Sequence, residues 1–169
     1  LSLSQAESLR AGHAARVPLD LLPLVHEVLV ELAPLAAHRE IDLGIGPSAR
    51  QARLYAHRPA LYALLFNLVD NAIRYTPPGG SATVSVATMP EGHVILEVED
   101  TGPGIPPELR TRVFERFNRG NAIDQEGTGL GLAIVQEAAA ACGGHVSLHT
   151  GRQGTGLRAM VKFKSARPT

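Results

Sequence analysis

Residues 67–75 read Asn-Leu-Val-Asp-Asn-Ala-Ile-Arg-Tyr and end a strongly apolar segment. Apolar residues recur through this segment at the helical period and predict one buried stripe: Leu61, Leu64, Leu65, Leu68, Val69, Ala72 and Ile73. Asn67, Asn71 and Arg74 follow one another at helical spacing, so their side chains cluster along one edge of that stripe. Because asparagine is a poor helix former, the cluster indicates either a polar role beside a cavity or ordinary solvated asparagines.

Three further motifs follow this helix, and each is weak by itself. Residues 100–106 read Asp-Thr-Gly-Pro-Gly-Ile-Pro, and residues 127–132 read Gly-Thr-Gly-Leu-Gly-Leu. Between them, residues 113–119 read Val-Phe-Glu-Arg-Phe-Asn-Arg. In this order and spacing, the four motifs resemble the N-box, first glycine box, F-box and second glycine box of the sensor histidine kinase catalytic domain, within the GHKL ATP-binding superfamily. The resemblance covers residues 17–164, which is nearly the whole chain.

Composition narrows the classes of function. A chain of 169 residues is one domain with room for a sizeable core. Its net charge is zero and it has no basic block, so we expect no nucleic-acid partner. Its one cysteine, Cys142, cannot form an internal disulfide, which fits a reducing compartment. We expect its side chain to be a small buried hydrophobic group.

The sequence predicts neither a signal peptide nor an apolar run of about 18 residues that could span a bilayer. We therefore expect a fragment that is soluble by itself. The resemblance implies that the full-length protein is anchored in the inner membrane, with this domain in the cytoplasm. It also implies a monomeric fragment, since dimerisation in such kinases belongs to helices upstream of the catalytic domain.

Periodicity and turn residues predict the order of helices and strands. Helices are expected at 20–38, with a kink or interruption at Pro34, and at 59–75, 107–114 and 130–141. Strands are expected near 15–19, 41–45, 52–56, 82–89, 93–99, 145–150 and 157–164, and a mobile loop at 118–128.

This pattern favours an α+β fold, a two-layer α/β sandwich with helices on one face of a mixed, mostly antiparallel sheet. The resemblance implies that this architecture is the Bergerat fold. We assign residues 1–16 to a linker or the end of an upstream dimerisation helix, and residues 17–169 to the ATP-binding catalytic domain.

Asp100 ends an apolar strand and precedes a glycine turn. A carboxylate there can accept a hydrogen bond from an exocyclic amine, and glycines let the backbone approach a flat ring. The resemblance implies that Asp100 contacts the adenine amine of ATP. It implies a base pocket lined by the residues that follow: Thr101, Gly102, Gly104 and Ile105. An ordinary turn remains the alternative for this stretch taken alone.

The second glycine motif opens a predicted helix. Free backbone N–H groups at a helix N-terminus suit phosphate, although no lysine follows, so the motif is not a P-loop. The resemblance implies that these residues, with two arginines that could reach the terminal phosphates, bind nucleotide: Gly127, Thr128, Gly129, Leu130, Gly131, Arg116 and Arg119. The alternatives are a glycine-rich hinge and solvated surface arginines.

The resemblance assigns the metal and the reaction to the asparagine helix. Asn71 is the expected Mg²⁺ ligand, assisted by Asn67, and Arg74 and Tyr75 lie near the phosphates and the nucleotide edge. Mg²⁺ prefers oxygen donors and is held largely by substrate phosphates, so one or two protein ligands suffice. ATP-hydrolysing relatives such as gyrase and Hsp90 carry Glu where this chain has Asn67. Because an amide cannot act as a base, we expect phosphoryl transfer rather than hydrolysis.

None of the seven histidines lies in the phospho-acceptor context of the family, so no residue of this chain is expected to be a catalytic base or acceptor. The predicted function is the ATP-binding catalytic domain of a bacterial two-component sensor histidine kinase. It presents the γ-phosphate of Mg-ATP to a histidine on a separate dimerisation domain, and the full-length protein acts on a response regulator. The alternatives are a GHKL ATPase-type conformational switch and an anti-sigma-type serine kinase.

Overall fold

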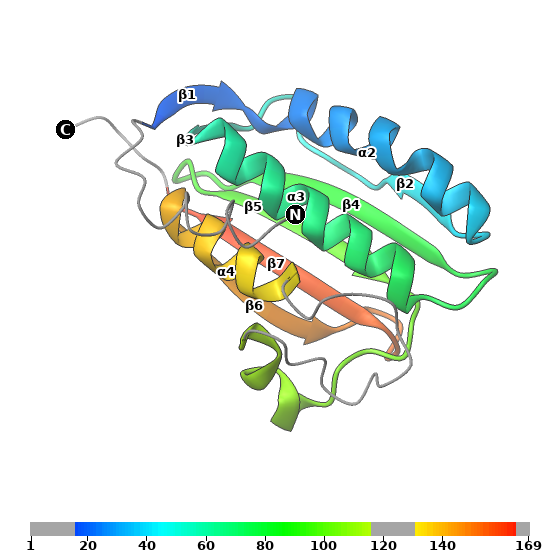
Figure 1. The fold of residues 1–169 in the computed structure, drawn as a ribbon. Coiled ribbons are helices and arrows are strands. Elements are labelled where there is room, and N and C mark those ends of the chain that lie inside the picture. Colours follow the sequence, from blue (N-terminus) through cyan, green and yellow to red (C-terminus); the bar gives the residue numbers. More distant parts are fainter. Residues whose placement is uncertain (1–15, 116–130, 165–169) are drawn as a thin grey trace.

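Three α-helices lie across one face of a five-stranded sheet in the computed structural model, which describes residues 16–115 and 131–164 (Figure 1). The order across the sheet is β2 (Asp42–Ile45), β4 (Ser81–Thr88), β5 (Val94–Asp100), β7 (Leu157–Phe163) and β6 (Gly144–Thr150). β2 runs parallel to β4, and the other neighbours are antiparallel. The predicted two-layer α+β sandwich is therefore confirmed.

A second, two-stranded sheet joins β1 (Val17–Asp20) to β3 (Arg53–Ala56) in antiparallel register. The sequence predicted both strands but not their pairing. At the start of β1, the Arg16 Nε donates a 2.9 Å hydrogen bond to the carbonyl of Ala141. Because Ala141 ends helix α4, this bond ties the residue before β1 to the C-terminal end of that helix.

Helix α2 (Leu21–His38) begins after Asp20, whose carboxylate accepts from the N–H of Leu22 as an N-cap. The expected kink or interruption at Pro34 is corrected in part, because the helix continues through this residue. Pro34 lies on the exposed face. The carbonyl that loses its helical partner there can be hydrated, so the proline is tolerated.

By length and composition alone, α2 could also cross a membrane, since its 18 residues have a mean hydropathy of 1.3. This corrects the expectation that no apolar run approaches that length. One face of the helix packs into the domain core: Leu21, Leu24, Val25, Val28, Leu32 and Ala36. A helix whose apolar stripe is buried in this way is a core helix of a folded domain.

Helix α3 (Arg58–Tyr75) lies between α2 and α4 over the middle of the sheet (Figure 1). The predicted stripe is buried and packs on the inward residues of the sheet, among them Val84, Leu96 and Val161. The helix starts without a side-chain cap from His57, and Pro59 occupies its first turn. Burial of this face, rather than capping, therefore holds the helix in place.

Helix α4 (Gly131–Ala141) packs beside α3. The helix predicted at 107–114 is corrected to two single turns of 3₁₀-helix, η1 (Pro107–Leu109) and η2 (Arg112–Phe114). Only Val113 is buried among these six residues, too little apolar contact to stabilise a short α-helix. The loop predicted at 118–128 lies outside the described residues.

Candidate functional site

Asp100 is buried at the end of β5, with 7% of its surface exposed. Its Oδ1 accepts hydrogen bonds from two backbone groups, the N–H of Gly102 at 2.9 Å and the N–H of Leu157 at 3.2 Å. Among the described residues both bonds end on Oδ1, so Oδ2 is the atom left to accept from a further donor. The carboxylate is thus oriented by the backbone on two sides.

Burial raises the pKa of Asp100 above its ordinary value, because desolvation disfavours the charged form. The hydrogen bonds from Gly102 and Leu157 oppose this rise, and the nearby charge of Glu99 adds to it. The carboxylate therefore carries a desolvation penalty that a ligand with a suitable donor can offset.

The glycine turn after Asp100 is packed too closely for side chains. A methyl group at Gly102 would lie 2.7 Å from the carbonyl oxygen of Tyr75 and 3.2 Å from Oδ1 of Asp100. Gly104 has φ +75°, and a methyl group there would lie 2.7 Å from the carbonyl oxygen of Gly156. Both positions require glycine, one for space and the other for space and backbone conformation.

The other residues predicted for this pocket have different surroundings. Thr101 is exposed, and its hydroxyl accepts a 2.9 Å hydrogen bond from the N–H of Ser81, so it ties the ends of β4 and β5 together. Ile105 packs partly buried against the core, and its carbonyl accepts from Nε of Arg110. Tyr75 is half-buried at the end of α3. The structure thus places all three near the turn.

The two asparagines of α3 face the start of α4. Asn67 is buried, with 7% of its surface exposed, and its Nδ2 donates to the carbonyl of Ala63 at 2.7 Å. A methyl group at Gly131 would lie 3.1 Å from both amide atoms of Asn71 and 3.5 Å from Oδ1 of Asn67. The structure therefore brings Asn67, Asn71 and Gly131 together, and Asn67 is deeper than the edge position expected.

Arg74 is engaged within α3. Its Nε donates to both carboxylate oxygens of Asp70 one turn earlier, at 3.0 and 3.1 Å. Its carbonyl accepts a 3.0 Å hydrogen bond from Nη2 of Arg39. The predicted contact of Arg74 with phosphate remains a prediction.

Several predicted residues lie outside the described ranges: Arg116, Arg119, Gly127, Thr128, Gly129 and Leu130. Within those ranges, no group of three or more His, Cys, Asp or Glu side chains could hold a metal ion. The amide oxygens of the asparagine pair are the donor type that Mg²⁺ accepts when substrate phosphates complete its coordination. The chemistry of this pair therefore fits a weakly held Mg²⁺.

Sequence reasoning missed two backbone contributors to the Asp100 site, Gly156 and Leu157. Gly156 has φ +80° and abuts the carbonyl of Asp100 so closely that a methyl group would overlap it. The signal was present, because three glycines fall within residues 151–156, the turn between the last two strands. Only the fold reveals that this turn meets β5.

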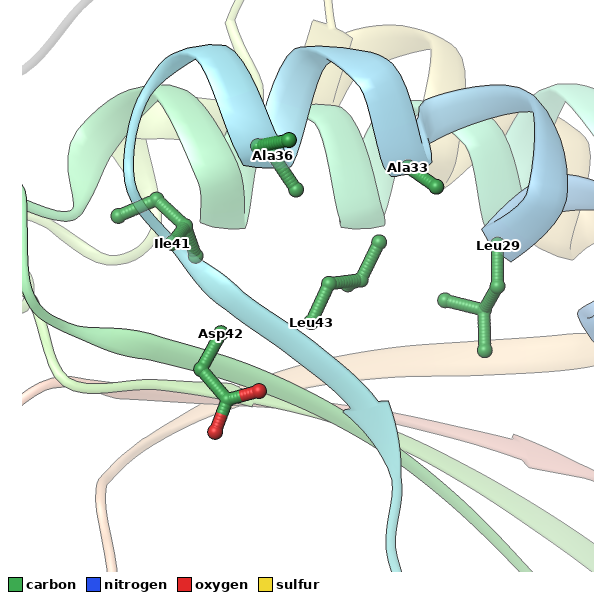
Figure 2. Close-up of a pocket in the computed structure, with 7 residues that line it drawn as sticks. Leu29, Ala33, Ala36, Ile41, Asp42 and Leu43 are labelled. Carbon is green, nitrogen blue, oxygen red and sulfur yellow. The ribbon is translucent and has the colours of Figure 1, made fainter.

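A separate pocket of about 290 Å³ lies between α2 and β2, lined by Leu29, Ala33, Ala36, Ala37, Ile41, Asp42 and Leu43. Figure 2 shows its apolar side chains gathered between the helix and the strand, with the carboxylate of Asp42 directed away from them. A pocket without a convergent polar group lacks the means to orient a nucleotide. We therefore place the candidate site at Asp100 and the asparagine pair.

Residues 56–167 match the family described as histidine kinase-, DNA gyrase B-, and HSP90-like ATPase. The chain belongs to this family. The matched range includes α3, Asp100 and the glycine turns described above, so the resemblance predicted from the motifs is confirmed. As a member of this ATPase family, the chain is an ATP-binding catalytic domain of the histidine kinase type.

Two relatives of this domain are longer proteins. It is 37% identical over 154 residues to the sensor protein kinase PmrB of Pseudomonas aeruginosa, covering 89% of this chain and 31% of that protein. It is 37% identical over 135 residues to the histidine-protein kinase/phosphatase MprB of Mycobacterium leprae, covering 79% and 25%. The chain thus spans about a third or less of these two relatives.

Solved structures of histidine kinases are similar in fold to this chain. The mycobacterial sensor histidine kinase MprB has a TM-score of 0.77 at 28% identity, covering 89% of this chain and 99% of that one. Full-length ShkA, solved in complex with AMPPNP, has a TM-score of 0.80 at 29% identity, covering 98% and 35%. This domain therefore has the fold of a histidine kinase catalytic domain.

Proposed function

We propose that this domain binds Mg-ATP and presents its γ-phosphate to a histidine on the dimerisation domain of the same sensor kinase. The observation that carries the proposal is Asp100, a buried carboxylate held by two backbone N–H groups beside a turn too tight for side chains. A flat base with an exocyclic amine matches both features of this pocket. The similarity to ShkA, which was solved with AMPPNP, supports the same ligand class.

At the base end, Oδ2 of Asp100 accepts a hydrogen bond from the adenine amine, and Gly102 and Gly104 let the ring approach the backbone. The hydrogen bond replaces the water that burial has removed from the carboxylate. A charge-assisted hydrogen bond contributes roughly 1.5–3 kcal/mol, so this contact can select adenine over a base with an oxygen in place of the amine.

At the phosphate end, Asn71 and Asn67 would hold Mg²⁺ through their amide oxygens. The Nδ2 of Asn67 already donates to Ala63, which leaves its Oδ1 for the metal or for a bridging water. Bound Mg²⁺ would neutralise negative charge on the phosphates. Gly131 faces this asparagine pair from the start of α4, and Arg74 follows Asn71 in α3, whereas the carbonyl of Tyr75 lies beside Gly102 at the base end. The arginines and glycines of 116–130 are proposed to complete the phosphate contacts.

The reaction that this chain favours is transfer to an external acceptor. The γ-phosphoryl group would leave the β-phosphate of ATP for an imidazole nitrogen of another domain, and ADP would be the product. Asn67 is buried and neutral, so it cannot take a proton from an attacking water. Positioning and charge neutralisation are sufficient for phosphoryl transfer.

The remaining parts of the proposal concern the longer protein. By analogy with the named relatives, we propose a membrane-anchored sensor kinase whose catalytic domain is cytoplasmic and whose phosphohistidine serves a response regulator. We propose that this fragment by itself is a monomer that binds no nucleic acid. Residues 1–16 are proposed to connect it to the dimerisation helices.

Calorimetric titration of the chain with AMPPNP, with and without Mg²⁺, tests the proposal. We expect binding that strengthens with Mg²⁺ and is weakened roughly 10–100-fold in Asp100→Asn. Adding the histidine-bearing domain with ATP should then give phosphohistidine, while the fragment alone should not label itself. Rapid ATP turnover by the fragment, abolished by Asn67→Ala, would instead indicate the ATPase-type switch.

A further inference from the structure

An ion-pair cluster occupies the sheet face opposite the helices, behind the Asp100 site. Along β5, Glu97 and Glu99 alternate with buried residues, so their side chains project to that opposite face. Arg152, in the turn between β6 and β7, bridges the two carboxylates. Its Nη2 lies 2.6 Å from Oε2 of Glu97, and its Nη1 lies 3.2 Å from Oε1 of Glu99.

The backbone of Arg152 is held as well. Its N–H donates to Oε2 of Glu99 at 2.7 Å, so Glu99 accepts from both the side chain and the main chain of one residue. Two backbone hydrogen bonds close the turn. The N–H of Gly151 donates to the carbonyl of Gly156, and the N–H of Gly154 donates to the carbonyl of Gly151. Three contacts from Arg152 therefore attach a compact turn, 151–156, to β5.

The other end of this turn reaches the carboxylate that the proposed function uses. Gly156 abuts the carbonyl of Asp100 and approaches Gly104 in the glycine turn. The N–H of Leu157 then donates to Oδ1 of Asp100 at 3.2 Å, the longer of the two bonds that orient that group. One short segment is thus bound to β5 by Arg152 on one face and by the Asp100 site on the other.

We propose that Arg152 is a positioning residue for adenine recognition: it holds the 151–156 turn on β5 so that Leu157 keeps Asp100 oriented toward the base. This inference rests on the proposed ATP site. Arg152 itself lies on the opposite face of β5 and does not touch the nucleotide.

The contribution of Arg152 to overall stability should be small. An effect of its removal on nucleotide affinity can therefore be distinguished from loss of folding. Its side chain is 56% exposed, while Glu97 and Glu99 are 13% and 25% exposed, so water screens these ion pairs from the arginine side and we expect a small contribution to stability. A second cation, Arg158, already lies 3.4 Å from Glu97 and remains when Arg152 is removed. What is lost without Arg152 is the attachment of the turn.

The test compares Arg152→Met, Arg152→Lys and a matched control, Arg58→Met. Arg58 is 57% exposed and forms a 2.7 Å pair with Glu27 at the other end of α3, so its loss removes an equally exposed arginine and its ion pair away from the site. The affinities of the whole chain for AMPPNP and GMPPNP are measured by calorimetry, because Asp100 should distinguish an amine from a carbonyl on the base.

We expect Arg152→Met to lower the affinity for AMPPNP about fivefold and to leave that for GMPPNP unchanged, which corresponds to about 1 kcal/mol. Arg152→Lys should restore most of the preference, and Arg58→Met should not change it. Equal losses for both nucleotides, or an unchanged preference in Arg152→Met, would overturn the inference.

Amide hydrogen exchange of the nucleotide-free chain gives a second readout. Arg152→Met should speed exchange of the Leu157 N–H about tenfold relative to Arg58→Met, with no change at the core residue Leu65. Unchanged exchange at Leu157, or an equal increase at Leu65, would overturn the inference even if the nucleotide data agreed. Failure of the unmodified chain to bind AMPPNP would overturn the proposed function instead, and the exchange data would still decide the role of Arg152.

Discussion

The two ends of the candidate site are held in place by different kinds of contact. At the end of β5, backbone N–H groups of Gly102 and Leu157 fix the Asp100 carboxylate, and close glycine contacts leave the turn little freedom. In the second half of α3, the side-chain amides of Asn67 and Asn71 face the first residue of α4. The contrast indicates a base pocket formed by the fold itself and a phosphate end whose polar groups need Mg²⁺ and phosphate as partners.

The largest effect, on nucleotide affinity, should follow removal of the negative charge of Asp100. Asp100→Asn keeps the shape and an acceptor for the two backbone donors, but its second atom becomes an NH₂ group facing the adenine amine. Loss of a charge-assisted hydrogen bond should weaken binding of AMPPNP roughly 10–100-fold by calorimetry. Asp42→Asn, an exposed carboxylate on β2, is the control and should bind normally. Equal affinity of the Asp100 variant would mean that the base does not bind here.

The close packing of the glycine turn after Asp100 predicts the second largest effect, a loss of folding stability. Gly102→Ala puts a methyl group 2.7 Å from the carbonyl oxygen of Tyr75, so the backbone must shift, at a cost of roughly 1–3 kcal/mol. Thermal unfolding should show a lower midpoint, by about 2–4 °C for each kcal/mol. Gly44→Ala is the matched control, since nothing lies within 4 Å of its added methyl group. Similar midpoints for the two variants would contradict the close packing inferred for the turn.

A substitution in the asparagine pair should lower nucleotide affinity only when Mg²⁺ is present. Asn71→Ala removes the proposed ligand, and binding of AMPPNP with Mg²⁺ should fall about tenfold, a loss of about 1.4 kcal/mol. Titration without Mg²⁺ serves as the internal control, because the Asp100 pocket is unchanged and the metal-free affinity should stay the same. An equal loss in both titrations would assign Asn71 to the nucleotide or to folding.

The smallest effect is a dependence of stability on pH. The folded pKa of Asp100 is raised, so its contribution to the free energy of unfolding is fully present below the ordinary value of 3.8 and is lost as the pH rises through the folded pKa. Asn at this position does not titrate. The stability of Asp100→Asn relative to the unmodified chain should therefore increase over that pH interval and then stay constant. Urea denaturation across the range checks this, and a difference that falls with pH would mean a lowered pKa.

Sequence alone predicted the elements whose signals are local. The periodic apolar stripe identified α3, and the alternation before Asp100 identified β5, because both patterns depend on neighbouring residues. Motif order then predicted the family, which the family match confirmed. The roles of the individual site residues remain predictions.

The structural features that could not be predicted from the sequence depend on contacts between residues far apart in the chain. The donors to Asp100 are backbone groups, and Leu157, 57 positions away, carries no residue-type signal for this role. The pairing of β1 with β3 joins two four-residue strands across the whole of α2. The two 3₁₀ turns replaced a predicted helix because tertiary burial, rather than local pattern, decides such short segments.

Helix α4 joins two places that are far apart in the chain. Its first residue, Gly131, faces the asparagine pair, and the carbonyl of its last residue, Ala141, accepts from Arg16. Eleven residues of α-helix form a rod about 16 Å long, stiff enough for its ends to move together. The Arg16–Ala141 hydrogen bond therefore links the residue before β1 to the same helix whose first residue borders Asn71.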